Sequence, residues 1–315
     1  MTGTKILGFG GYQPDKVVTN DDLAKVVDTN DEWIRTRVGI QSRRFARDDE
    51  TVTDMAEAAG AKALAASGLE PSEVDLVIVA TCSPESPMPN VAASVASRLG
   101  IPAPGAYDLN AACAGFCYGI GAASDSVRAG SARNVLVIGA EKMTSWIDPT
   151  DRSTCIIFAD GAGAAVVGPA GEGEPSGIGP VVWGSAGDQA QKITIDGRNG
   201  SLKQDGQAVF RWATTAMAPV ALEACRRAGV TPAEISAFVP HQANLRIIES
   251  IAKKLGIPRE RVADDIITAG NTSSASIPLA LSRMAEQGRL QPGTPALLLA
   301  FGAGLSYASQ VVTVP

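Results

Sequence analysis

The chain has 315 residues, of which 45% are hydrophobic and 19% are charged, and its formal net charge is −6. This length suffices for one large domain or two fused domains with a sizeable core. The acidic balance excludes a general binder of nucleic acid or of anionic membranes. Because no run reaches about 18 uninterrupted apolar residues, we expect no membrane-spanning helix.

The N-terminal sequence and the cysteines indicate a cytoplasmic protein. The opening MTGTKILGFG lacks the apolar run and cleavage site of a signal peptide. The five cysteines form no C-x-x-C pair, so we expect a reducing compartment and no metal site. The chain contains one histidine, His241, which excludes any mechanism that requires two.

The order of the expected elements predicts an internal duplication. Segment 62–81 is typical of an amphipathic helix that ends at Gly68, followed by a proline-containing turn and a short apolar strand. Segment 223–242 repeats this order, and its Gly229 lies 161 positions after Gly68. One such match would be ordinary for βα units, so the argument depends on further matches.

The same offset returns later in the chain. The sequence DLNAACAGF at 108–116 corresponds to AGNTSSASI at 269–277, which pairs Cys113 with Ser274. The elements expected next are helices at 113–129 and 274–287, then apolar strands at 134–140 and 295–301. A sustained offset of this kind predicts a duplicated chain.

The strands are nearly uninterrupted apolar runs, which indicates sheets that are covered on both faces. Two such halves predict an α/β fold built from layers of helix and sheet. The sequence PAGEGEPSG interrupts the periodicity near 170–176, so we place the halves at 1–172 and 173–315. Strand ends from both halves would then meet around a pseudo-twofold axis.

Cys113 is the candidate nucleophile. It lies between an expected strand and an expected helix, where the positive end of the helix dipole favours a thiolate. Its small neighbours leave room for a substrate carbonyl. From local context, a buried structural cysteine stays open as the more common alternative. The other cysteines are expected not to act as nucleophiles: Cys82, Cys117, Cys155 and Cys225.

His241 and Asn271 are the candidate partners of Cys113. His241 follows the apolar strand SAFVP, a position suited to a cleft, although a lone histidine is more often a surface or core residue. Asn271 lies in a Gly-Asn-Thr turn, where capping a helix is the simpler role. The duplication favours the catalytic interpretation because it brings both residues to strand ends facing Cys113. The loop FGAGLSYA at 301–308 could present a backbone N–H to an oxyanion.

A set of motifs is distinctive in combination: DEWIRTRVGI (31–40), NAACAGF (110–116), DPTDR (148–152), FADGAGA (158–164), VPHQANLRII (239–248), GNTSSASIP (270–278) and FGAGLSYA. Together they resemble the β-ketoacyl-acyl-carrier-protein synthase III family, the initiating condensing enzymes of type II fatty-acid synthesis. The resemblance covers essentially the whole chain. It implies the duplicated α-β-α-β-α fold of the thiolase superfamily, normally as a homodimer.

The resemblance implies a catalytic triad of Cys113, His241 and Asn271. Cys113 would accept an acyl group from acyl-CoA, while the backbone N–H groups of Cys113 and Ala303 hold the oxyanion. His241 and Asn271 would donate hydrogen bonds to the enolate formed when malonyl-acyl carrier protein loses CO₂. The implied product is 3-oxoacyl-acyl carrier protein, and no cofactor is expected besides the acyl-CoA substrate.

The resemblance also implies three binding regions. The CoA-binding residues would be Trp33, Arg37, Arg152, Gly206, Phe210, Arg211 and Asn244. The acyl pocket would comprise Cys82, Met88, Met143, Phe158 and Leu202, with Met88 reaching across the dimer. Acyl carrier protein would dock on Arg246, Lys253 and Lys254, whose spacing fits one helix face but also fits a solvated charge run. Segment 185–203 matches no pattern, so the length and branching of the acyl primer stay open.

Other members of the superfamily fit less well. Elongating ketosynthases need a second histidine, and degradative thiolases need a cysteine in the loop 301–308, which contains none. A 3-hydroxy-3-methylglutaryl-CoA synthase needs a glutamate beside the nucleophile, for which Glu85 is the nearest candidate. A related enzyme of secondary metabolism that acylates a different acceptor is the main alternative. A Cys-His-Asn hydrolase and a catalytically silent scaffold are the alternatives from other classes.

Overall fold

The first half of the chain builds a five-stranded sheet. The computed structural model describes residues 3–197 and 200–315. The strands stand in the order β1 (Thr4–Tyr12), β7 (Asp160–Pro169), β6 (Val135–Lys142), β4 (Leu76–Ala80) and β5 (Gly105–Leu109). β4 is parallel to both of its neighbours, whereas β7 is antiparallel to β1 and β6.

The second half builds a four-stranded sheet with the corresponding order. Its strands are β8 (Val182–Ser185), β13 (Ser306–Thr313), β12 (Pro295–Gly302) and β11 (Ala237–Pro240). β11 is parallel to β12, and β13 is antiparallel to β12 and β8. An isolated bridge from Phe238 to Val262 stands where the first sheet has β5. The matching order supports the predicted duplication, and the boundary at 172 stays a prediction.

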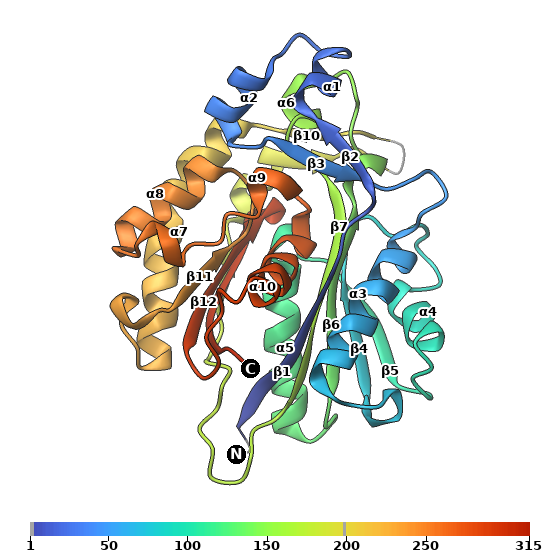
Figure 1. The fold of residues 1–315 in the computed structure, drawn as a ribbon, viewed down its shortest axis with the longest axis vertical. Coiled ribbons are helices and arrows are strands. Elements are labelled where there is room, and N and C mark those ends of the chain that lie inside the picture. The colour runs from blue at the N-terminus through green and yellow to red at the C-terminus, as the bar shows by residue number, and fades with distance from the viewer. Residues whose placement is uncertain (1–2, 198–199) are drawn as a thin grey trace.

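Helices form three layers around the two sheets (Figure 1). The long helices α5 (Gly115–Ala129) and α10 (Ser276–Glu286) lie between the sheets. The outer face of the first sheet is covered by α3 (Val52–Ser67) and α4 (Val91–Arg98). The outer face of the second sheet is covered by α7 (Gly206–Ala228) and α8 (Leu245–Leu255). The result is the α-β-α-β-α arrangement expected from the sequence.

The alternation of side chains along each strand explains these layers. On β6, Val135 and Val137 face the central core while Leu136 and Ile138 face the outer one. β12 behaves in the same way, because odd and even positions contribute to different cores. Successive side chains of a strand point to opposite faces, so a continuous apolar run is needed when both faces are covered.

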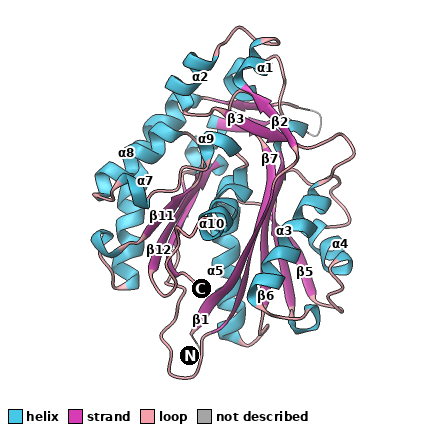
Figure 2. Ribbon diagram, viewed as in Figure 1, coloured by secondary structure: helices cyan, strands magenta, loops and turns pink. Residues whose placement is uncertain are grey.

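Smaller elements gather at one end of the molecule (Figure 2). They include the hairpin of β2 (Lys16–Thr19) and β3 (Ser42–Phe45), with α1 (Asn20–Ala24) and α2 (Asp31–Val38) beside it. The short helices α6 (Arg152–Cys155) and α9 (Ile266–Ala269) and the hairpin of β9 (Ile193–Ile195) and β10 (Leu202–Gln204) complete this end. None of the helices within the described ranges is long and apolar enough to cross a membrane.

The two central helices each follow a strained 3-10 turn. The helices begin at Gly115 and Ser276, slightly later than expected, because residues 112–114 and 273–275 form these turns. Ala112 has φ +46° and Ser273 has φ +52°, a region that non-glycine residues seldom adopt. These residues are 161 positions apart, so the duplication extends to a strained backbone at the same place in both halves.

Candidate active site

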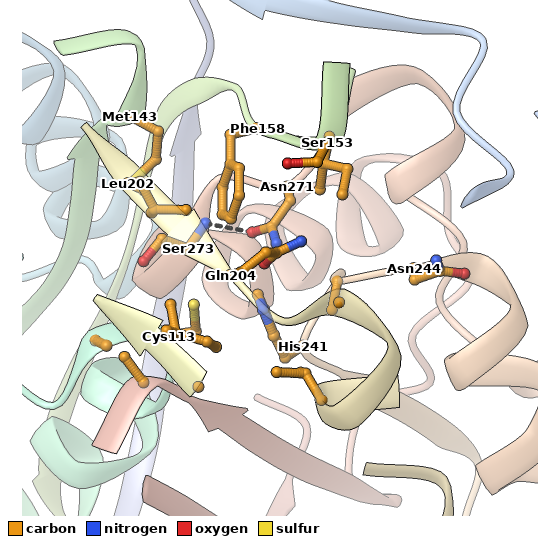
Figure 3. A pocket seen from close by; sticks show the side chains of 18 of the residues that line it. Cys113, Met143, Ser153, Phe158, Leu202, Gln204, His241, Asn244, Asn271 and Ser273 are labelled. Atoms are coloured by element: carbon orange, nitrogen blue, oxygen red, sulfur yellow. Dashed lines mark hydrogen bonds between the residues drawn. The ribbon is translucent and has the colours of Figure 1, made fainter. Parts of the chain in front are cut away.

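Strand ends from both halves surround a cavity of about 910 Å³. Cys113, His241 and Asn271 all line it, and their side chains point toward the same hollow in Figure 3. Ala303, the expected second oxyanion residue, lines it as well. The three residues of the expected triad, far apart in the sequence, therefore share one chamber.

Cys113 lies in the 3-10 turn between β5 and α5. The N-terminal end of a 15-residue helix favours negative charge at this place. Burial acts in the opposite direction and raises the pKa of the Cys113 thiol to about 12. The helix end and the burial therefore act in opposite directions on the thiol, and burial is the larger influence on its pKa. A base or the approaching substrate must therefore help to remove the proton.

Gly302 at the end of β12 allows a close approach to Cys113, the candidate nucleophile. A Cβ atom on Gly302 would lie 2.8 Å from the Cβ and 2.9 Å from the backbone nitrogen of Cys113. Such distances are shorter than van der Waals contact, so any side chain at this position would push the two segments apart. Glycine is therefore required here because of space, and the adjoining Ala303 is kept beside Cys113.

His241 is held rigidly and is neutral. It follows β11, is 2% exposed, and its Nδ1 lies 2.7 Å from Ser276 Oγ. Its ring meets the ring of Phe301 edge-on, with centroids 5.4 Å apart. Burial lowers the pKa of His241 to about 3, because a charged imidazolium would be desolvated. With Nδ1 engaged by Ser276, Nε2 is the ring nitrogen left to interact with a substrate.

The carboxamide of Asn271 has a fixed orientation. Its backbone is held on both sides, by the carbonyl of Ile157 and the N–H of Ala159, each at 2.9 Å. Its side-chain oxygen Oδ1 accepts the N–H of Ser273 at 2.8 Å, as the dashed line in Figure 3 marks. Because Oδ1 is occupied, the amide nitrogen Nδ2 is the group available to donate into the cavity.

Most residues expected to bind CoA lie along the outer part of the cavity. Trp33 carries two guanidinium groups over its ring, with Arg152 at 4.9 Å and Arg37 at 5.8 Å from the centroid. Arg152 is the member of the expected set outside the lining, and its guanidinium lies over the ring of Trp33. The members in the lining are Trp33, Arg37, Gly206, Phe210, Arg211 and Asn244.

The inner part of the cavity is apolar. Cys82, Met143, Phe158 and Leu202 line it, as expected for an acyl pocket. Met88 is 82% exposed and lies outside the lining, so its contribution across a dimer stays a prediction. Segment 185–203, which the sequence left open, supplies one wall through β9 and β10. Residues 198 and 199 of this segment lie outside the described residues.

The expected docking residues lie on one helix. Arg246, Lys253 and Lys254 all belong to α8. Arg246 reaches the mouth of the cavity and its guanidinium lies 5.2 Å from the centroid of the Phe210 ring. Lys254 donates to the carbonyl of Thr214 on α7. A basic helix therefore borders the entrance.

Sequence reasoning missed several polar residues close to the triad. Ser276 contacts His241, Ser273 contacts Asn271, and Gln204 lines the cavity beside them. Glu141 was also missed, although a charged residue at the end of the apolar run VLVIGA was a usable signal. Glu85, the nearest candidate from the sequence, accepts the N–H of Thr53 at the start of α3. In the described part of the chain, no cluster of three or more His, Cys, Asp or Glu side chains could hold a metal ion.

Known proteins match this chain over its full length. Residues 107–187 match the family 3-oxoacyl-(acyl-carrier-protein) synthase III, and residues 225–314 match its C-terminal part. β-Ketoacyl-(acyl-carrier-protein) synthase III 2 of Streptomyces avermitilis is 53% identical over 315 residues, which cover 100% of both chains. The mycobacterial β-ketoacyl-(acyl-carrier-protein) synthase III of Mycobacterium avium is 47% identical and covers 100% of this chain and 96% of its own.

Solved structures agree in fold. The priming β-ketosynthase of the R1128 polyketide pathway has a TM-score of 0.96 at 44% identity and covers 100% of this chain and 97% of its own. The 3-oxoacyl-(acyl-carrier-protein) synthase III of Aquifex aeolicus has a TM-score of 0.96 at 43% identity, covering 99% and 100%. This chain therefore belongs to the β-ketoacyl-acyl-carrier-protein synthase III family of condensing enzymes, with the thiolase fold.

Proposed function

We propose that this chain condenses a short acyl-CoA primer with malonyl-acyl carrier protein, using Cys113 as nucleophile and His241 and Asn271 as enolate-stabilising donors. The single observation that carries the proposal is the shared cavity. A thiol, a neutral imidazole and an oriented carboxamide line one chamber that is apolar on its inner side. Family membership supports the same reaction.

In the first half-reaction, the sulfur of Cys113 attacks the thioester carbonyl of acyl-CoA. Its proton leaves with the CoA sulfur, so the step yields an acyl-Cys113 thioester and free CoA. The negative oxygen of the tetrahedral intermediate would accept the backbone N–H groups of Cys113 and Ala303. Gly302 contributes by keeping this loop against the nucleophile.

In the second half-reaction, the malonyl thioester loses CO₂ and leaves an enolate. A neutral His241 donates through Nε2, and Asn271 donates through Nδ2, so two hydrogen bonds reach the same oxygen as its charge develops. The enolate carbon then attacks the acyl carbonyl and the bond to the Cys113 sulfur breaks. The products are 3-oxoacyl-acyl carrier protein and a Cys113 thiolate, which takes up a proton.

The outer part of the cavity would hold CoA and the basic helix would hold the carrier protein. Adenine is flat and aromatic, so it can stack between Trp33 and the guanidinium of Arg152. Acyl carrier protein is acidic, which is complementary to Arg246, Lys253 and Lys254 on α8. We also propose a homodimer, two halves divided at residues 172 and 173, a cytoplasmic location, and no cofactor.

The test is intact-mass analysis with acyl-CoA, followed by malonyl-acyl carrier protein. An acyl adduct should form on the wild-type chain, be absent from Cys113→Ala, and disappear only after the malonyl partner is added. An adduct that persists in Cys113→Ala would reject the assigned nucleophile. A His241→Ala variant should still form the adduct but lose most of the decarboxylation, and normal decarboxylation would reject its role.

A second candidate function is the priming of a secondary-metabolite pathway. The observation that favours it is the similarity to the priming β-ketosynthase of the R1128 polyketide pathway. Both functions share the acyl-Cys113 intermediate and differ in the acceptor of the acyl group. A competition experiment separates the two functions. Malonyl-carrier proteins of the fatty-acid type and of the polyketide type compete to consume the acyl-Cys113 adduct.

A further inference from the structure

Glu141 is a buried carboxylate surrounded by hydrogen-bond donors. It lies at the end of β6, where it is 0% exposed. Oε2 accepts the backbone N–H of Cys82 at 3.0 Å, and the Cys82 thiol lies 3.3 Å from Oε1. Four hydroxyl groups also donate to this carboxylate. Those of Thr81 and Ser83 lie 3.2 Å and 2.6 Å from Oε2, and those of Ser273 and Ser274 each lie 2.9 Å from Oε1.

This arrangement suits a group that only accepts hydrogen bonds. A carboxylate offers acceptor positions only, whereas a protonated carboxyl or an amide would turn a donor toward some of these groups. The hydrogen bonds compensate the charge for its loss of water, since hydrogen bonds to an ionised acceptor are the strong ones. A full set of donors around one charge also fixes the segments that supply them.

The duplication explains why Glu141 occupies this place. The residue 161 positions later is Gly302, which also ends a central strand. Gly302 approaches the turn that carries Cys113, and the end of β6 approaches the matching turn at 273–275. A Cβ on Gly139 would lie 2.4 Å from the carbonyl oxygen of Ser274, which shows how closely they pack. The strand end in the second half has Gly302 and leaves space for Cys113. The strand end in the first half has Glu141, whose carboxylate fills the equivalent space.

Through Ser273, Glu141 reaches the catalytic carboxamide. The hydroxyl of Ser273 is bound to Glu141, and its N–H is bound to Oδ1 of Asn271. In the first half, Ala112 likewise donates its N–H to Oδ1 of Asn110 at 3.1 Å but has no hydroxyl to anchor. Ser273 has a positive φ that non-glycine residues seldom adopt, so the surrounding contacts must hold it. Glu141 supplies such a contact in the half that carries Asn271.

We propose that Glu141 is a positioning residue for the second half-reaction, holding Ser273 so that Nδ2 of Asn271 faces the enolate. This inference rests on the proposed function of the site. Glu141 is outside the cavity lining, so it acts through Asn271 and does not touch the substrate. Glu141 and Ser273 also act on the Cys113 thiol, but in opposite directions, because the charge of Glu141 raises its pKa and a hydrogen bond from Ser273 lowers it. Cys113 is held in place against Gly302 on the other strand, so acylation should change less than decarboxylation.

The substitution Glu141→Gln tests this with little change in volume. The N–H of Cys82 requires an oxygen at the position of Oε2, so the amide nitrogen falls where Oε1 stood, facing Ser273 and Ser274. The Ser274 hydroxyl already lies 2.7 Å from the carbonyl of Ala80 and keeps that acceptor. The Ser273 hydroxyl loses its carboxylate acceptor and keeps only the weaker sulfur acceptors, so the perturbation concentrates on the residue that orients Asn271.

Two rates are measured in each variant: formation of the acyl adduct, and CO₂ release from malonyl-acyl carrier protein. In Glu141→Gln we expect acylation within about twofold of wild type and decarboxylation slower by about tenfold to a hundredfold, as for a misplaced catalytic group. The matched control is Glu50→Gln, because Glu50 is 3% exposed and binds Tyr12 and Arg47 instead of residues 271–275. It should leave both rates near wild type.

A second variant keeps the test decisive if Glu141→Gln does not fold. Ser273→Ala removes the hydroxyl and should produce the same separation of the two rates. In the double variant the losses should not add, because both substitutions break one interaction. Equal slowing of both half-reactions, or no slowing in either variant, would overturn the positioning role. A wild-type chain that forms no acyl adduct would instead reject the proposed function.

Discussion

Nδ1 of His241 and Oγ of Ser276 lie 2.7 Å apart, and both side chains are buried. Ser276 Oγ also accepts the backbone N–H of Gln242 at 3.3 Å. Because Oγ accepts the N–H of Gln242, the hydroxyl proton of Ser276 remains available for donation to Nδ1. A Ser276 hydroxyl that donates to Nδ1 would leave the proton of the neutral ring on Nε2, the tautomer that an enolate-stabilising donor requires.

Ser276→Ala should therefore slow decarboxylation more than acylation. Without the hydroxyl, His241 loses the partner that selects its tautomer, and we expect decarboxylation to fall by about tenfold. Because the chain has one histidine, a ¹⁵N spectrum of labelled protein reports its tautomer directly. The control is Ser282→Ala, a buried serine of the same helix that binds Glu286. A wild-type spectrum with the proton on Nδ1 would contradict the assignment.

His241 should remain neutral over the physiological range. Burial lowers its pKa from 6.5 to about 3, so the unfolded chain binds a proton between these pH values and the folded chain does not. With respect to His241, the folded protein is therefore most stable above about pH 6.5, and its free energy of unfolding falls as the pH drops toward 3. The ¹⁵N signals of His241 should not titrate between about pH 8 and about pH 5. A midpoint near 6.5 would show that the ring is solvated.

Gly302→Ala should displace Cys113 and slow its acylation without altering any charge. The new methyl group would lie 2.8 Å from the Cβ of Cys113, and relieving that overlap should cost about 1–3 kcal/mol. We expect adduct formation to slow by at least about tenfold, together with a lower melting temperature. Gly187→Ala is the control, since nothing lies within 4 Å of its added Cβ. Normal acylation in Gly302→Ala would mean that the approach is not required.

Trp33→Ala should raise the KM for acyl-CoA and leave kcat nearly unchanged. Stacking of a cation or a flat ring on tryptophan contributes up to about 2 kcal/mol, so an increase of roughly tenfold in KM is expected. A matched substrate separates binding from structure: an acyl thioester that ends at the pantetheine arm lacks adenine and should be used equally by both proteins. An equal loss with the truncated substrate would contradict adenine stacking.

Lys253→Glu should weaken the carrier-dependent step. Lys253 lies on α8 outside the cavity lining, so a charge reversal there should raise the KM for malonyl-acyl carrier protein by several-fold to about tenfold, and less at high salt. Acylation by acyl-CoA should be unchanged. The matched control is Arg133→Glu, because Arg133 is exposed and lies two residues before the start of β6. Equal KM values in the two variants would reject the docking surface.

Repetition and apolar patterning were sufficient to predict the fold class. The helix ends at Gly68 and Gly229, and the turns after them, recur because each half must build the same strand–helix unit. The residues expected to form the triad follow strands or turns in those units, so their convergence in one cavity followed from the duplication. The hairpin of β9 and β10 was not predictable, because its short strands gain their order by packing over the cavity.

The sequence by itself determined the two similar halves and the chemical groups at their strand ends. Both depend on local periodicity and residue type, which the order of amino acids states directly. Only the tertiary structure decided that burial lowers the pKa of His241, that Ser276 contacts its ring, and that Glu141 binds the turn at Ser273. These properties arise from burial and from contacts between distant segments, and local sequence carries no record of either.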